Sequence, residues 1–219
     1  MLHLSTSNLS GQKLLRKAFH RMHKVFLKKY EAYAGFDEVF TSGHYDCLTA
    51  TALFSRVLEQ LNYPCKIIET NYHIFLMVQT AEGNVLLETT DRFTGFITGE
   101  EAIASRTNDY QKNILAGDHS KVVYYQYAFN LYQQISAEKL NGLLYFNQAV
   151  KAYNHHEWIA SACMLQKADV LYPSQRCEEL GALLIQTILA GSPDEKTKEV
   201  CLTHLKNFWT RKSRVVASN

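Results

Sequence analysis

Three side chains that together can perform nucleophilic catalysis stand within one stretch of the sequence, residues 43–95. Cys47 comes immediately before an apolar helical pattern over residues 48–61. His73 opens an apolar run that indicates a strand, and Asp91 follows the next such run. A thiol at a helix start, an imidazole at a strand start and a carboxylate after a strand end are the parts of a cysteine nucleophile with its base and orienting group.

The predicted position of Cys47 favours a reactive thiol. The first turn of a helix has unpaired backbone N–H groups and the positive end of the helix dipole, and both stabilise the thiolate. Gly43 permits a close approach of backbone just before the nucleophile, whereas the carboxylate of Asp46 opposes the thiolate unless it caps the helix. His73 can take the thiol proton while Asp91 fixes the ring tautomer. The alternative is that Cys47 is a buried small hydrophobic residue.

The elements that position these residues are a helix and the strands that follow it. After the helix, apolar runs separated by turn-forming residues predict strands at 65–69, 74–78 and 85–88. This order indicates an α+β fold rather than alternating βαβ units. A basic amphipathic helix over 9–33 precedes the block, and we expect its His20 and His23 to be solvated.

The second half of the chain has helical patterning from residue 121 to the end. Before it, a helix start is expected at 98–101 and a polar loop at 107–118. Two antiparallel helices are predicted at 140–153 and 158–171, with Tyr145, Ala149, Leu165 and Ala168 at their interface. This pair resembles one tetratricopeptide repeat. We therefore expect two domains, 1–118 and 119–219.

Composition excludes several functional classes. Hydrophobic residues make up 47% and charged residues 20% of the chain, and the net charge is only +2, so neither disorder nor nucleic-acid binding is expected. No apolar run reaches the ~18–20 residues of a membrane span. The five cysteines contain no CxxC pair, so we expect a reducing, cytoplasmic location and no zinc site. No phosphate-binding glycine loop or acidic calcium loop is present, and no cofactor is expected.

Gly43-x-x-x-Cys47 with its helix, His73 before an apolar strand and Asp91 after a second strand together resemble the transglutaminase-like core. That core is a papain-like fold with a Cys, His, Asp triad in this chain order. Asp91-Arg92-Phe93-Thr94-Gly95 is similar to the Asp-Pro-Phe-x-Gly ending of bacterial members that carry helical repeats behind the core. The resemblance covers residues 38–96. It implies Cys47 as nucleophile, His73 as base and Asp91 as orienting carboxylate.

The sequence departs from the family pattern at three places. Ile74 replaces the aromatic residue after the histidine, and Arg92 replaces the usual proline. Glu88 competes with Asp91 for the third role, because an alignment shifted by three residues matches the strand end almost as well. Strand alternation places Glu88 and Asp91 on different faces, although a bend at Thr89-Thr90 could change this. The match to the family ending favours Asp91.

The resemblance implies an α+β protein with a papain-like, transglutaminase-like core, an N-terminal helix and a C-terminal helical, repeat-like tail. The leading hypothesis is a cysteine-dependent acyl-transfer enzyme, a peptide or amide hydrolase that forms a thioester on Cys47. The alternative is a catalytically inactive scaffold that binds a protein partner through the helical tail. Expected partners are therefore a peptide or protein substrate and a protein bound to the tail.

Overall fold

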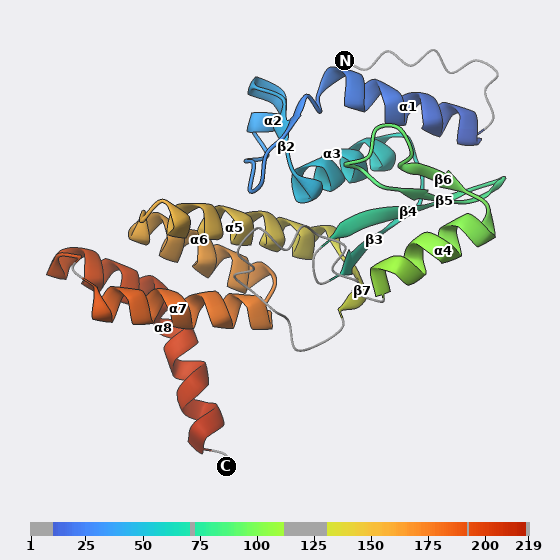
Figure 1. Ribbon diagram of the computed structural model, residues 1–219. Coiled ribbons are helices and arrows are strands. Elements are labelled where there is room, and N and C mark those ends of the chain that lie inside the picture. Colours follow the sequence, from blue (N-terminus) through green and yellow to red (C-terminus); the bar gives the residue numbers. More distant parts are fainter. Residues whose placement is uncertain (1–10, 71–72, 112–130, 192, 218–219) are drawn as a thin grey trace. The chain divides into compact units, whose positions relative to one another are not determined.

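The chain divides into two compact units in the computed structural model, which describes residues 11–70, 73–111, 131–191 and 193–217 (Figure 1). Unit 1 comprises the described residues of 1–31 and 37–136, and unit 2 those of 32–36 and 137–219. The boundary in the second half of the chain falls after Ser136, not after residue 118 as expected, and a short earlier segment belongs to unit 2. The boundary lies later because residues 132–135 form a strand that belongs to unit 1, although the sequence pattern had suggested helix there.

The elements of unit 1, in chain order, are α1 (Gly11–Val25), β1 (Lys29–Tyr30), α2 (Glu38–Thr41), β2 (His44–Tyr45), α3 (Cys47–Gln60), β3 (Cys65–Thr70), β4 (Ile74–Thr80), β5 (Gly83–Leu87), β6 (Phe96–Thr98), α4 (Glu100–Gln111) and β7 (Tyr132–Ile135). The helices of unit 2 are α5 (Ala137–Asn154), α6 (Trp158–Leu171), α7 (Gln175–Ala190) and α8 (Glu195–Ala217).

An antiparallel sheet of five strands, in the order β6-β5-β4-β3-β7, is the centre of unit 1. The three strands predicted from the sequence form β3, β4 and β5, with boundaries within two residues of those expected. A two-residue turn joins β4 to β5, because Thr80 pairs with Gly83. Consecutive residues of β4 and β5 are buried, among them Phe75, Leu76 and Leu86. Burial of consecutive residues requires cover on both faces of the sheet.

Helices supply that cover. On one face, α3 packs against β3 and β4. Phe19 of α1 lies 5.4 Å from Phe54 of α3 between ring centroids, so α1 packs on α3. On the other face, Ile103 and Tyr110 of α4 pack on the buried cluster that contains Phe75 (Figure 1). Unit 1 is therefore a sheet between two helical layers.

Two predictions failed beside this sheet. α4 extends to Gln111, so residues 107–111 are helical and not part of a loop; residues 112–118 lie outside the described part. Residues 132–135 form β7, which pairs with β3, although the pattern from residue 121 onward had suggested helix. A short edge strand takes most of its stability from pairing with its neighbour, so its own sequence carries little signal.

Unit 2 confirms the predicted helix pair. α5 and α6 contain the two predicted helices, and α6 has the expected boundaries. Ala149, Leu165 and Ala168 are fully buried in one cluster, and Tyr145 packs against it. The Oγ of Ser161 donates to the backbone oxygen of Ala149 over 2.9 Å, which holds the two backbones close. Small residues at the contact permit this approach.

The whole chain has the predicted α+β composition, with strands followed by helices, and its main sheet is antiparallel. A separate two-stranded parallel pair, β1 with β2, leads into α3. Over the residues that the structure describes, every helix is either too short or too polar to cross a membrane.

Candidate active site

Asp46 fixes the start of α3 and thereby the place of Cys47, the first residue of the helix. The Oδ1 of Asp46 accepts from the backbone N–H of Thr49 over 2.8 Å, and the backbone N–H of Asp46 donates to the Oγ1 of Thr49 over 2.8 Å. This reciprocal arrangement is a capping box. The sequence had left open whether Asp46 caps the helix, and the structure shows that it does.

Gly43 allows the backbone just before α3 to lie close to residues 26–29. Its φ is +79°, and a Cβ at this position would lie 2.4 Å from Cγ of Lys28. The backbone oxygen of Gly43 accepts from the N–H of Lys28 over 2.9 Å. The expectation of a close backbone approach before Cys47 is confirmed, and no residue with a side chain fits there without strain.

The ring of His73 is paired with Glu88. His73 immediately precedes β4 and Glu88 immediately follows β5. Because these strands are antiparallel, with Leu76 opposite Leu87, the start of one and the end of the other lie at the same edge. The Nε2 of His73 makes a short hydrogen bond with the Oε2 of Glu88.

Glu88 is itself held by three further hydrogen bonds. Its Oε1 accepts from the backbone N–H and the Oγ1 of Thr90, over 3.2 and 2.7 Å. Its Oε2 also accepts from the hydroxyl of Tyr110. Burial alone raises the pKa of Glu88, but the hydrogen bonds from His73, Tyr110 and Thr90 outweigh it and hold this pKa below its ordinary value. A buried, ionised carboxylate therefore faces the imidazole.

Asp91 does not meet His73, which corrects the expectation from the sequence. Its Oδ1 accepts from the backbone N–H groups of Phe93 and Thr94 over 3.0 and 2.9 Å, and its Oδ2 accepts from the hydroxyl of Thr94. Asp91 thus closes the turn that follows β5. The pattern of residues 91–95 that matched the family ending builds this turn, and Glu88 takes the contact expected of Asp91.

Gly95 makes the turn compact. A Cβ at Gly95 would lie 2.2 Å from the backbone oxygen of Asp91 and 2.3 Å from that of Glu88. The backbone N–H of Glu88 donates to the oxygen of Gly95 over 2.8 Å, and the N–H of Gly95 donates to the oxygen of Asp91 over 3.0 Å. The turn folds back on the end of β5, and this reversal directs Glu88 and Asp91 to different partners.

The thiol of Cys47 is not activated in this structure. Burial and, to a smaller extent, the charges of Asp46 and Glu88 together raise its pKa to about 12. The backbone N–H groups of Cys47 and Leu48 lower the pKa, as a helix start should, but they do not outweigh the other causes. Among the described residues, no hydrogen bond joins the sulfur of Cys47 to His73.

A buried contact nevertheless joins α3 to the strand end that bears Glu88. The hydroxyls of Thr51, one turn after Cys47, and Thr89, next to Glu88, are 3.0 Å apart. Both threonines are fully buried. The charge of Glu88 also raises the pKa of the Cys47 thiol. The cysteine therefore lies close enough to the His73–Glu88 pair to interact with it electrostatically.

Two residues of α4 complete the surroundings of the pair, and sequence reasoning missed both. The ring of Tyr110 stacks on Phe75 at 5.0 Å and lies 5.2 Å from the ring of His73. Arg106 contacts the hydroxyl of Tyr110, and its charge lowers the pKa of Asp91. The spacing of Ile103, Arg106 and Tyr110 on one helical face was the available signal, but residues 107–118, which include Tyr110, were assigned to a loop.

His23 of α1 is buried, which contradicts its expected solvated position. It is 1% exposed, and its Nε2 has no hydrogen-bond partner among the described residues. Its ring lies 4.6 Å from Phe19 and 5.7 Å from Phe54. Burial, assisted by the charges of Arg92 and His20, lowers the pKa of His23 to about 4, although the charges of Asp91 and Glu88 oppose this shift. The histidine is therefore neutral at physiological pH.

An open groove of about 770 Å³ lies between the turn end of the β4–β5 hairpin and α4. Its lining includes Met77 and Asn84 from the hairpin and Ile103 and Thr107 from α4. Cys47, His73 and Glu88 do not line it, so the groove does not lead to the candidate nucleophile.

Comparison with known proteins returned nothing: no family model, no curated protein and no solved structure matches this chain.

Proposed function

We propose that unit 1 is a transglutaminase-like, papain-like cysteine domain that transfers or hydrolyses acyl groups, with a peptide or amide as substrate. Cys47 is the nucleophile, His73 the base and Glu88, in place of Asp91, the carboxylate that orients the base. The observation that carries the proposal is the hydrogen-bonded His73–Glu88 pair, whose strand end is joined to the cysteine helix through Thr89 and Thr51.

The orientation of His73 assigns its two nitrogens. Nε2 contacts Glu88, so Nδ1 is the atom that accepts the thiol proton. The sulfur of Cys47 then attacks the carbonyl carbon, and the ionised carboxylate of Glu88 stabilises the imidazolium that forms. His73 returns the proton to the leaving amine as the thioester forms. Water, deprotonated by His73, attacks the thioester; the carboxylic acid leaves and the thiol regains its proton.

The start of α3 supplies a site for the oxyanion. The backbone N–H groups of Cys47 and Leu48 act on the sulfur and lower its pKa. Donors in this position can also bind the negative oxygen of a tetrahedral intermediate. The capping box occupies the N–H groups of Asp46 and Thr49 and leaves those of Cys47 and Leu48 to the reacting group.

The raised pKa of Cys47 determines the order of events. With a pKa of about 12, the thiol is protonated in the free protein. Proton transfer to His73 must therefore accompany attack on the substrate, as it does with serine nucleophiles. A thiolate–imidazolium pair that exists before substrate binds is not part of this proposal.

The test is to trap the acyl intermediate. We expect p-nitrophenyl acetate to acetylate the sulfur of Cys47, and mass spectrometry of the digested protein to find the acetyl group on the peptide that contains it. Cys47→Ala should abolish this modification, and His73→Gln should slow it by about 100-fold or more. Acetylation of Cys163, which is also partly exposed, serves as the internal control. Equal modification of Cys47 in the native protein and in His73→Gln would contradict the proposal.

A second candidate function, an inactive scaffold, is favoured by specific observations. The thiol pKa of about 12 is that of a structural cysteine. Unit 2 also exposes large apolar residues, with Ile159 and Val170 on α6 and Leu183 and Leu189 on α7. Exposed apolar side chains of this kind are found at protein-binding surfaces. If no acyl-Cys47 forms with esters or peptide amides, the scaffold becomes the better account, and unit 2 its binding part.

A further inference from the structure

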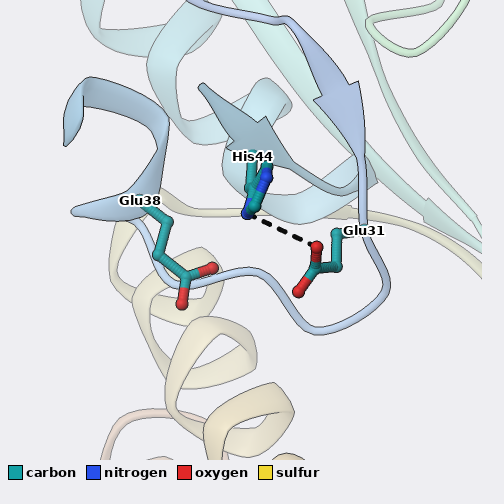
Figure 2. A group of neighbouring side chains, drawn as sticks. All are labelled: Glu31, Glu38 and His44. Atoms are coloured by element: carbon teal, nitrogen blue, oxygen red, sulfur yellow. Dashed lines mark ion pairs between the residues drawn. The ribbon is translucent and has the colours of Figure 1, made fainter. Parts of the chain in front are cut away.

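Glu31, Glu38 and His44 gather at one place in unit 1, away from the hydrogen bonds of the His73–Glu88 pair. Glu31 directly follows β1, Glu38 opens α2 and His44 opens β2. Figure 2 shows their side chains directed toward a common space. One potential ligand atom from each residue lies within 4.8 Å of those of the other two.

Backbone hydrogen bonds hold the three segments in place. The N–H of Glu31 donates to the oxygen of Tyr45 over 2.8 Å, beside His44. The oxygen of Glu38 accepts from the N–H of Gly43 over 2.8 Å. The parallel pairing of Lys29 with His44 adds to this frame. The three side chains therefore start from fixed backbone positions, which limits the conformational entropy lost when they bind a common ligand.

We propose that Glu31, Glu38 and His44 form a binding site for one first-row divalent metal ion, with Zn²⁺ as the best fit. For three atoms mutually within 4.8 Å, some point lies within about 2.8 Å of all three. Zinc binds nitrogen and carboxylate oxygen at about 2.0–2.2 Å. The ligand atoms must therefore move toward the central point by less than about 1 Å. Rotation about the χ angles of these half-exposed side chains allows such a movement.

The chemistry of the set selects the ion. Two carboxylates and a neutral imidazole together carry two negative charges, which balance a dication. An imidazole ligand favours zinc and its neighbours over Ca²⁺ and Mg²⁺, which prefer oxygen. The Glu31 and His44 side chains are 41% and 31% exposed, so a water molecule can take a fourth position. Three protein ligands and an open position are typical of zinc sites that exchange or activate ligands.

A cation already lies beside the cluster. The Nζ of Lys29 is 3.5 Å from the Oε2 of Glu31, and the lysine side chain is 68% exposed. The Nδ1 of His44 is 3.4 Å from the same oxygen. The ammonium group offsets part of the negative charge that a metal would neutralise, and its long exposed side chain can move into solvent when the metal binds.

The test is metal binding by the full chain, measured by equilibrium dialysis against ZnCl₂ in a non-thiol reductant. We expect one zinc ion per chain. Glu31→Gln, Glu38→Gln and His44→Gln should each weaken binding by at least about tenfold. Lys29→Gln should strengthen it, because the competing ammonium is gone. Glu59→Gln is the matched control: Glu59 is exposed and paired with Arg56 on α3, and its loss should leave zinc affinity unchanged.

Cobalt distinguishes this site from adventitious metal binding by any of the five cysteine thiols. Co²⁺ at Glu31, Glu38 and His44 should give d–d absorption bands without the sulfur-to-cobalt charge-transfer band of a thiolate site. Circular dichroism of each variant checks that it is folded. The proposal is overturned if the three variants bind zinc as tightly as the native chain, or if the cobalt spectrum shows thiolate ligation. Zinc affinity and the cobalt spectrum do not depend on acyl transfer by Cys47. The metal-site proposal can therefore fail or succeed independently of the proposed function.

Discussion

In the proposed mechanism, Glu88 has opposite effects on His73 and Cys47. Its negative charge would orient His73 and stabilise the imidazolium, which would help proton transfer. The same charge raises the pKa of Cys47 and so disfavours the thiolate. Removing the charge should therefore change thiol reactivity and acyl transfer in opposite directions.

Glu88→Gln should make Cys47 react faster with iodoacetamide. At pH 8, a thiol with a pKa of about 12 has a thiolate fraction on the order of 10⁻⁴, so the native rate should be low and should rise with pH well beyond 9. Loss of the Glu88 charge lowers the pKa, and the rate at pH 8 should increase several-fold. Cys163 in the same protein gives the reference rate. An unchanged Cys47 rate would show that burial alone sets the pKa.

The same Glu88→Gln variant should slow acetylation of Cys47 by p-nitrophenyl acetate by about 100-fold or more, since an amide cannot stabilise the imidazolium. Asp91→Asn is the matched control, because Asp91 bonds only within its turn in the described contacts. It should stay within about threefold of the native rate. Should Asp91→Asn be the more damaging change, the assignment of the third residue would return to Asp91.

The turn after β5 is the element that separates Glu88 from Asp91, and Gly95 is its critical residue. Gly95→Ala should lower the free energy of unfolding of unit 1 by about 1–3 kcal/mol, because the added methyl group must displace backbone oxygens at 2.2 and 2.3 Å. Urea denaturation followed by circular dichroism measures the change. Gly11→Ala serves as control, since its methyl group would meet side-chain atoms and no backbone oxygen, the nearest being the Oε2 of Glu82 at 3.2 Å. Equal midpoints for both variants would show that the turn relaxes freely.

The element boundaries show which patterns carry structural information on their own. α3, α5 and α6 were predicted because their apolar residues repeat at helical spacing over long runs. β7 was missed because a strand of four residues at the sheet edge has too few positions for a pattern. α4 was cut short because its exposed polar residues resemble those of a loop, and only Ile103 and Tyr110 mark the face that packs on the sheet.

At the scale of the molecule, buried His23 should make stability depend on pH. Its pKa is about 4 in the folded protein and about 6.5 in an unfolded chain. The unfolded state therefore binds the proton first as pH falls. The contribution to stability is complete above pH 6.5 and is lost between about pH 6.5 and 4. It amounts to about 3 kcal/mol by proton linkage.

His23→Leu should remove that pH dependence between pH 6.5 and 4, measured as the midpoint of urea denaturation by circular dichroism. Glu88 and Asp91, with lowered pKa values, should still destabilise the protein below about pH 4. Their window is distinct from that of the histidine. A His23→Leu midpoint that falls between pH 6.5 and 4 as steeply as that of the native protein would contradict the role of His23.

The two units should also respond differently to acid. Both tryptophans of the chain, Trp158 and Trp209, belong to unit 2, so tryptophan fluorescence reports on that unit alone. His23 and Glu88 belong to unit 1. Between pH 6.5 and 4, urea midpoints from circular dichroism should fall while those from tryptophan fluorescence stay within experimental error. Coincident shifts would show that the units unfold as one cooperative body.

The sequence by itself determined the places of Cys47 and His73 on their elements, the α+β composition and the α5–α6 pair. All of these follow from local periodicity and capping, which need only neighbouring residues. Tertiary structure decided which carboxylate meets His73, because the contact depends on how the turn around Gly95 reverses. It also decided the burial of His23, the high pKa of Cys47 and the meeting of Glu31, Glu38 and His44. The burial of His23 and much of the pKa shift of Cys47 come from segments distant in sequence, while the meeting of Glu31, Glu38 and His44 depends on the pairing of β1 with β2. No local periodicity records such contacts.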